Sequence, residues 1–204
     1  MRMRKKKRRE ERIAARAGLH FGRGFGTPVF LEIGCGKGGF ICELAKNTPG
    51  HNFVAVERNR DVVLLAMERA DRLGLGNVRF LIAEAEKLAD YFEPGQVAGI
   101  YLNFSDPWHK NAHAHRRLTH GRFLSVYKKI MMPGASLSMK TDNQGLFDFS
   151  VKSLAENGFE IISCTRDLYA GGCLCGNVQT EYEQKFVAEG AKIYRLEARI
   201  LEEG

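Results

Sequence analysis

The chain of 204 residues has little of what marks a membrane or secreted protein. No apolar run approaches the ~18 residues that a membrane-spanning helix needs. The basic N-terminus is not followed by an apolar segment, so we expect no secretory signal. The five cysteines are an odd number without a paired framework, which is typical of a reducing compartment. The sequence therefore predicts a cytoplasmic protein without a membrane span.

Residues that could bind a metal are few and poorly spaced. Cys173 and Cys175 lack a second cysteine pair, and His113 and His115 lack the i, i+4 spacing of a helical zinc site. We expect no metal, and a plain glycine-rich loop around Cys173 is favoured.

Positive charge is concentrated at the N-terminus. The net charge is +7, and residues 1–12 hold eight Lys or Arg against two Glu, a net of +6. Such a run is usually solvated, although it can also hold phosphates. We expect residues 1–20 to form a flexible basic tail and residues 21–204 to form a single domain.

Apolar segments of strand length alternate with segments of helical period along the rest of the chain. This alternation indicates an α/β fold with a mostly parallel sheet and helices on both faces. No helix is predicted between the last two strands, so we expect an antiparallel hairpin at the C-terminal edge. The predicted strands are 29–33, 52–57, 78–82, 98–104, 135–141, 159–165 and 194–200, and the predicted helices are 39–47, 58–73, 117–132 and 144–157.

Three glycines, Gly34, Gly36 and Gly39, follow the first strand. Glycines at such a turn let the backbone approach a ligand closely. Their spacing also satisfies the dinucleotide pattern, so an NAD-binding enzyme is an open alternative. Glu32 favours a cationic ligand such as S-adenosylmethionine, because a pyrophosphate prefers a helix N-terminus without a nearby anion. Glu57 ends the second strand, where it would accept hydrogen bonds from a ribose.

Further candidates follow the next two strands. Glu84 fits a contact to an adenine amino group and an exposed acid equally well. Asp106 follows the fourth strand at the ligand edge, and Pro107 restricts its backbone, which indicates a functional carboxylate. Trp108 fits core packing and a platform for a planar substrate equally well. The basic stretch after Lys110 suits a phosphate backbone.

Five motifs together resemble the bacterial tRNA (guanine-N7)-methyltransferases, in family order, from about residue 31 to residue 194. The resemblance implies a class I, Rossmann-like S-adenosylmethionine-dependent methyltransferase fold. It implies methyl transfer to N7 of the variable-loop guanine of tRNA, at position 46, with methylation of another RNA base as an alternative. The motifs are Glu32–Gly38, Ser105–Lys110, Arg116–Leu118, Thr141–Asn143 and Thr180–Glu183.

The resemblance also implies roles for individual residues, with Asp106 as the catalytic residue. Cofactor contacts are implied for Glu32, Gly34, Gly36, Gly38, Glu57, Glu84 and Asp106. Substrate contacts are implied for Lys110, Asp142, Thr180, Glu181, Tyr182 and Glu183. RNA contacts are implied for Ala112, His113, Ala114, His115, Arg116 and Arg117.

The sequence departs from the family pattern at a few positions. Glu84 stands where the family usually has aspartate, and Ser105 and His109 stand where it usually has prolines. The loop from Asn111 to His115 is less basic than is common in the family. The sequence leaves the oligomeric state open.

Overall fold

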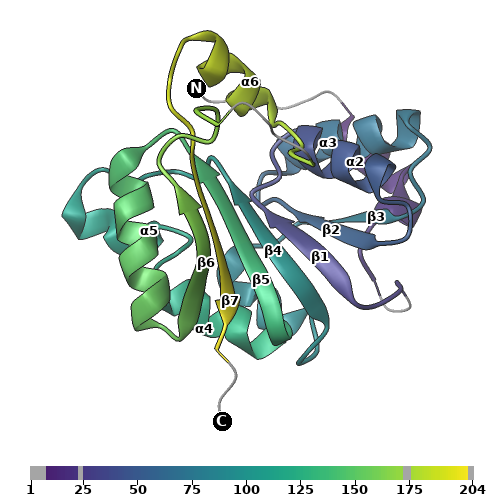
Figure 1. Cartoon of the computed structure of the whole chain (residues 1–204). Helices are drawn as coiled ribbons and strands as arrows, with labels where there is room; N and C mark the ends of the chain where they lie inside the picture. Colours follow the sequence, from purple (N-terminus) through teal and green to yellow (C-terminus); the bar gives the residue numbers. More distant parts are fainter. Residues whose placement is uncertain (1–7, 23–24, 172–175, 202–204) are drawn as a thin grey trace.

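A computed structural model describes residues 8–22, 25–171 and 176–201 of the chain. These residues contain one seven-stranded sheet with the order β3-β2-β1-β4-β5-β7-β6 (Figure 1). Strands β1 to β5 run parallel, and β7 is antiparallel to both β5 and β6. The strands are β1 Val29–Ile33, β2 Asn52–Val56, β3 Val78–Leu81, β4 Val97–Asn103, β5 Met131–Thr141, β6 Phe159–Thr165 and β7 Tyr194–Ile200.

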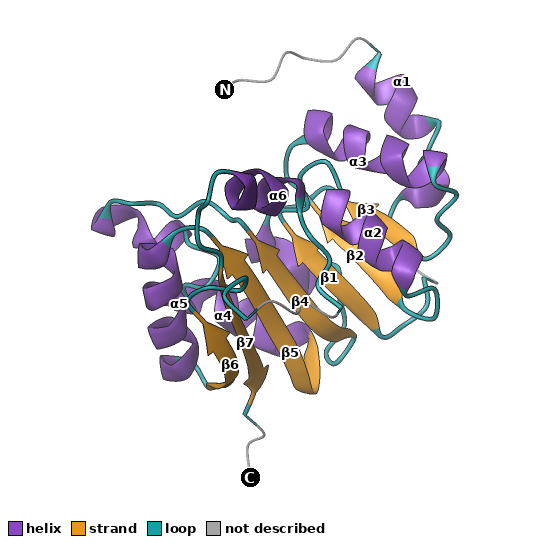
Figure 2. Ribbon diagram, turned by 45° about the horizontal axis from the view of Figure 1, so that its top comes forward, coloured by secondary structure: helices purple, strands orange, loops and turns teal. Residues whose placement is uncertain are grey.

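Helices cover both faces of this sheet (Figure 2). The α-helices are α1 Arg9–Ala14, α2 Gly39–Asn47, α3 Arg60–Arg72, α4 Gly121–Ile130, α5 Gln144–Glu156 and α6 Glu181–Ala188. The short 3-10 helices are η1 Ala17–Leu19, η2 Ala85–Asp90 and η3 Asn111–Arg116. Among the described residues, no helix has the length and apolar character to cross a membrane.

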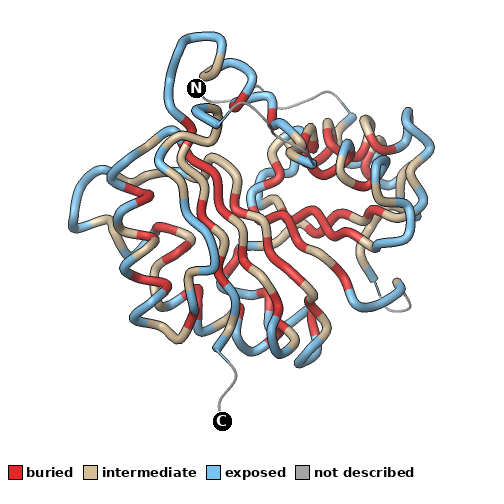
Figure 3. Tube along the Cα trace, in the orientation of Figure 1, coloured by how far each residue is buried: buried red, intermediate tan, exposed pale blue. Residues whose placement is uncertain are grey.

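Successive residues of a strand point to opposite faces of the sheet, so the strands contribute side chains to two apolar clusters, one on each face. Leu31 and Val54 pack with α4 and α5 on one side, whereas Phe53 and Phe80 pack with α2 and α3 on the other. The buried residues therefore follow the strands and the inner sides of the helices (Figure 3). The predicted α/β fold with a mostly parallel sheet is confirmed.

The C-terminal part differs from a simple hairpin. Strands β6 and β7 pair in antiparallel fashion, as predicted, but α6 lies between them in the chain. A capping box starts α6, in which Thr180 and Glu183 each accept a hydrogen bond from the other's backbone N–H. This S/T-x-x-E signal is visible in the sequence, and a helix should have been predicted from it.

Helix α1 lies within the stretch that was expected to be a flexible tail. Ile13 is buried, and Arg9, Arg12 and Arg16 form ion pairs with acidic residues of α3, namely Asp61, Glu68 and Asp71. These arginines are thus engaged in contacts within the chain, and the expectation of a flexible tail over residues 1–20 stays a prediction. Residues 1–7, which hold most of the remaining basic run, lie outside the described residues.

Candidate active site

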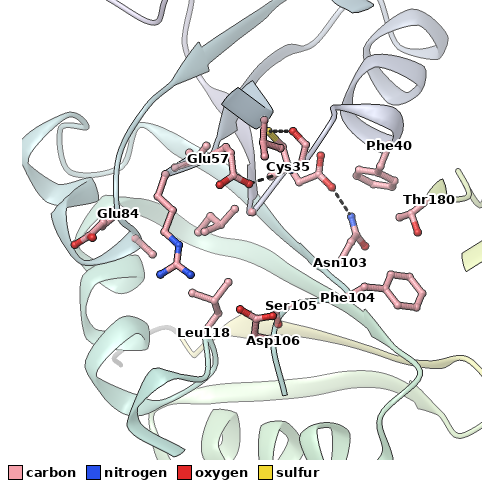
Figure 4. Close-up of a pocket in the computed structure, with 18 of the residues that line it drawn as sticks. Cys35, Phe40, Glu57, Glu84, Asn103, Phe104, Ser105, Asp106, Leu118 and Thr180 are labelled. Carbon is pink, nitrogen blue, oxygen red and sulfur yellow. Dashed lines mark hydrogen bonds between the residues drawn. The ribbon is translucent and has the colours of Figure 1, made fainter. Parts of the chain in front are cut away.

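A cavity of about 1070 Å³ opens where the parallel strands end (Figure 4). Its walls come from the turns after β1, β2, β3 and β4, from η3 and from the first turn of α6. Parallel strands present their carboxyl ends at one edge, and this is where folds of this kind bind ligands. The predicted site residues that line it are Glu32, Gly34, Gly36, Glu57, Glu84, Asp106, His115, Arg116, Thr180, Glu181 and Tyr182.

The glycine turn after β1 is open toward the cavity at two positions. Gly34 and Gly36 have φ values of 81° and 55°, and apart from the adjacent residues no heavy atom lies within 4 Å of where a Cβ would stand. Gly38 differs, because a Cβ there would lie 2.8 Å from the Cβ of Ala66. The missing side chain of Gly38 thus lets α2 approach α3 closely. Gly38 does not line the cavity, and its expected cofactor contact stays a prediction.

Glu32 is buried at the tip of β1, with 3% of its surface exposed. Its Oε1 accepts a hydrogen bond from Asn103 Nδ2 at 3.0 Å. Its Oε2 has no hydrogen-bond partner among the described residues, although the nearby Ile41 N–H helps to lower the pKa of the carboxyl. Burial outweighs the contributions of Asn103 and Lys140 and raises the pKa of Glu32 to about 8. The pocket therefore contains an acid that a cationic ligand would stabilise in its charged form.

Glu57 and Glu84, two further acidic candidates for cofactor contact, differ in how firmly their side chains are held. Glu57 Oε2 accepts from the N–H of Gly36 at 3.3 Å, and its Oε1 accepts from the N–H of Asn59 at 2.9 Å. Glu57 thus connects the end of β2 to the glycine turn. Glu84 is exposed on the cavity wall and makes no capping bond to η2. Its contact to the cofactor stays a prediction.

The loop after β4 presents Asp106 to the same cavity. Phe104 and Trp108 hold left-handed φ values of 49° and 44°, so the loop is sharply bent on both sides of Asp106. The guanidinium of Arg117 donates to the carbonyl oxygens of Pro107 and Trp108, each at 3.0 Å, and lies 4.5 Å from the ring centroid of Phe149. Arg117 is 8% exposed and supports this loop, and its expected contact with RNA stays a prediction.

Trp108 lies on the cavity wall and does not pack in the core. Its ring meets His113 edge-on at a centroid distance of 6.0 Å, and Arg116 stacks on it at 4.7 Å. Of the stretch expected to touch RNA, His115 and Arg116 line the cavity, whereas Ala112, His113 and Ala114 belong to η3 without lining it. Lys110 is exposed just before η3.

Two substrate candidates are placed differently from one another. Asp142 is exposed after β5, and the neighbouring Asn143 caps α5 by accepting from the Leu146 N–H at 2.8 Å, which leaves the Asp142 carboxylate outside that cap. Glu183 is 0% exposed and does not line the cavity, and its expected substrate contact stays a prediction.

Comparison with known proteins identifies the family. Residues 26–196 match the family model described as "Putative methyltransferase". A tRNA (guanine-N(7)-)-methyltransferase of Brevibacillus brevis is 44% identical over 175 residues, or 86% of this chain and 82% of the relative. A protein of the same name from Bacillus subtilis is 44% identical over 171 residues, or 84% of this chain and 80% of the relative. This chain belongs to the tRNA (guanine-N7)-methyltransferase family.

Solved structures support the same fold at much lower identity. The 16S rRNA methyltransferase KamB matches with a TM-score of 0.64 and 17% identity, covering 93% of each chain. A SAM-dependent methyltransferase from Aquifex aeolicus matches with a TM-score of 0.58 and 17% identity, covering 96% of this chain and all of the other. The fold is therefore that of the α/β S-adenosylmethionine-dependent methyltransferases.

The residues of the cavity fit the methyl donor of this family. The buried Oε2 of Glu32 lacks a hydrogen-bond partner among the described residues, and S-adenosylmethionine carries a cationic sulfur and an ammonium group. The open backbone at Gly34 and Gly36 leaves room for a ligand at the turn. Among the described residues, no group of three or more His, Cys, Asp or Glu side chains is placed to hold a metal ion. Cys173 and Cys175 lie outside the described residues.

Two residues at or near the site, Asn103 and Lys140, were not predicted from the sequence. Asn103 ends β4 and orients Glu32, and its signal was a polar residue at the end of an apolar strand. Lys140 is buried in β5 beside Glu183, and its signal was a lysine inside a predicted strand. A polar residue at a strand end or a lysine inside a strand indicates that the side chain needs a hydrogen-bond or ion-pair partner. Neither feature identifies that partner, because Glu32 and Glu183 lie far from Asn103 and Lys140 in the sequence.

Proposed function

We propose that this protein transfers a methyl group from S-adenosylmethionine to N7 of the variable-loop guanine, position 46, of tRNA. One observation carries the proposal: Glu32, Glu57 and Asp106, from three different strand ends, line a single cavity. The motif order and the family membership of the chain support the choice of tRNA as substrate.

The acidic side chains have separate tasks in this proposal. Glu32 attracts the cationic half of the cofactor, and Glu57 accepts hydrogen bonds from the ribose hydroxyls, with Glu84 toward the adenine. When bound, S-adenosylmethionine supplies an electrophilic methyl group on a positively charged sulfur. The partnerless oxygen of Glu32 argues against the NAD alternative, because an anionic pyrophosphate would not stabilise the charged form of this buried carboxyl group.

Asp106 acts on the base rather than as a proton acceptor from the nucleophile. Guanine N7 has a free lone pair and carries no hydrogen, so no side chain has to deprotonate it. As the ring acquires positive charge, its N1–H and exocyclic amine become stronger donors. Asp106, with Asp142 as a second acceptor, then stabilises the transition state more than the ground state.

The rim of the cavity would hold the RNA. Arg116 stacks on Trp108, His115 lines the same cavity and Lys110 precedes them, so phosphates and the exposed base would have cationic and aromatic neighbours. Thr180, Glu181 and Tyr182 form the opposite wall, where Tyr182 is 63% exposed and available to a planar base.

An assay for N7-methylguanosine tests the proposal. The protein is incubated with an unmodified tRNA transcript and labelled cofactor, and the tRNA is then cleaved by reduction and aniline treatment, which breaks the chain at N7-methylguanosine. We expect scission at the variable-loop guanine and none in a transcript with adenosine at that position. Methyl incorporation without scission would point to another base and would refute the proposal.

A further inference from the structure

Lys140 is a buried charge that the proposed mechanism does not use. It lies in β5, is 4% exposed and does not line the cavity. A lysine ammonium has three donors, and all three are engaged here. Its Nζ donates to Asn177 Oδ1 at 3.2 Å, to the carbonyl of Val178 at 2.8 Å and to Glu183 Oε2. All three acceptors lie in the segment that leads into α6 or in its first turn.

The backbone of Lys140 contacts the opposite wall of the cavity. Its carbonyl oxygen accepts a hydrogen bond from the N–H of Phe104 at 2.8 Å, where the loop that carries Asp106 begins. The ring of Phe104 in turn stacks on Tyr182 and Phe186 of α6, with centroid distances of 6.4 and 5.9 Å. A single residue of β5 therefore holds the loop with its carbonyl and α6 with its ammonium.

Glu183, the ion-pair partner of the Lys140 ammonium, also makes several further hydrogen bonds. The carboxylate of Glu183 also accepts from Tyr169 Oη at 2.7 Å, from Asn177 Nδ2 at 2.9 Å and from the N–H of Thr180 at 3.2 Å. Burying an ion pair is costly, and an apolar pair of similar volume often serves stability as well. What an apolar pair cannot supply is a directional link that fixes where α6 begins.

We propose that Lys140 is a positioning residue for methyl transfer, which sets the placement of the Thr180–Tyr182 turn relative to the Asp106 loop. The inference rests on the proposed function, because these two walls are the ones that would hold the cofactor and the guanine. A displacement of about 1 Å between reacting groups can reduce a rate about 10²-fold. Lys140 would act through its neighbours without touching either substrate.

The test compares Lys140→Met with a control that weakens the fold elsewhere. Asn77→Ala serves as the control, because the Asn77 amide donates to the carbonyls of Ala45, Thr48 and His51 and does not line the cavity. We expect Lys140→Met to lower kcat on tRNA by about 10²-fold. Its dissociation constant for S-adenosylmethionine, measured by calorimetry, should change only a few-fold. Asn77→Ala should lower the thermal midpoint and leave kcat unchanged.

A double variant keeps the inference testable if Lys140→Met is too unstable. Lys140→Met combined with Glu183→Gln removes both buried charges, so the thermal midpoint should recover toward that of the wild type. We expect kcat to stay low in the double variant, because the directional link is still missing. Recovery of kcat together with stability, or a Lys140→Met enzyme with wild-type kcat, would overturn the inference. Absence of N7 methylation by the wild-type protein would instead refute the proposed function.

Discussion

The side-chain amide of Asn103 donates a hydrogen bond to Oε1 of Glu32 at 3.0 Å and so ties the tip of β4 to the tip of β1. The contact orients the carboxyl group but satisfies only one of its oxygens. The other, Oε2, is buried without a hydrogen-bond partner among the described residues. The free protein thus contains a group whose charged form is unfavourable until a cation binds, and two predictions concern that group.

The first prediction concerns the stability of the variant Glu32→Gln. Folding raises the pKa of Glu32 from an ordinary 4.5 to about 8, so between these pH values the folded protein holds a proton that the unfolded chain has lost. The free energy of unfolding should therefore fall with rising pH in this window, by at most about 1.4 kcal/mol per pH unit. In Glu32→Gln this part of the pH dependence should vanish, as urea unfolding across the window would measure. Parallel curves for the two proteins would contradict the assignment.

The second prediction concerns the pH dependence of cofactor binding. A cationic ligand favours the carboxylate form of Glu32, so binding below about pH 8 should release a proton. The affinity for S-adenosylmethionine should then rise by up to about tenfold per pH unit and level off above about pH 8. Calorimetry in two buffers of different ionisation enthalpy measures the released proton. Glu32→Gln should bind at least about 10²-fold more weakly and release none.

The third prediction separates catalysis from cofactor binding at Asp106. Asp106→Asn keeps the shape of the side chain but removes the negative charge that would stabilise the cationic guanine. We expect kcat to fall about 10²-fold, with the dissociation constant for S-adenosylmethionine changed only a few-fold. Single-turnover methylation at saturating cofactor measures the first quantity, and calorimetry measures the second. Turnover close to that of the wild type would remove Asp106 from its catalytic role.

The fourth prediction distinguishes two adjacent arginines. Arg116 is exposed on the cavity wall, so Arg116→Ala should reduce the slope of log affinity for tRNA against log salt by about one. Arg117 is buried and supports the loop through two backbone carbonyls, so Arg117→Met should leave that slope unchanged and lower kcat and the thermal midpoint. Filter binding over a range of salt concentrations gives both slopes. A reduced slope in Arg117→Met would show that its charge reaches the RNA.

The elements around the glycine turn were predictable because their signals are local. The strand 29–33 and the helix 39–47 were predicted with the bounds that the structure shows, since an apolar run and a helical period each lie within a few residues. Helix α6 was missed because its short sequence was interpreted as a substrate motif. The capping box between Thr180 and Glu183 was the local signal that should have decided the matter.

The sequence by itself determined the alternation of strands and helices, and with it the edge of the sheet at which a ligand binds. Only the tertiary structure decided which charged side chains line the cavity and which are buried, because their partners are far apart in the chain. Glu32 and Asn103 are 71 residues apart, and Lys140 and Glu183 are 43 residues apart. The cost of burying a charge depends on such partners. For this reason the sequence alone does not show that Glu183 and Arg117, which were expected to contact the substrate and the RNA respectively, are buried in the folded protein.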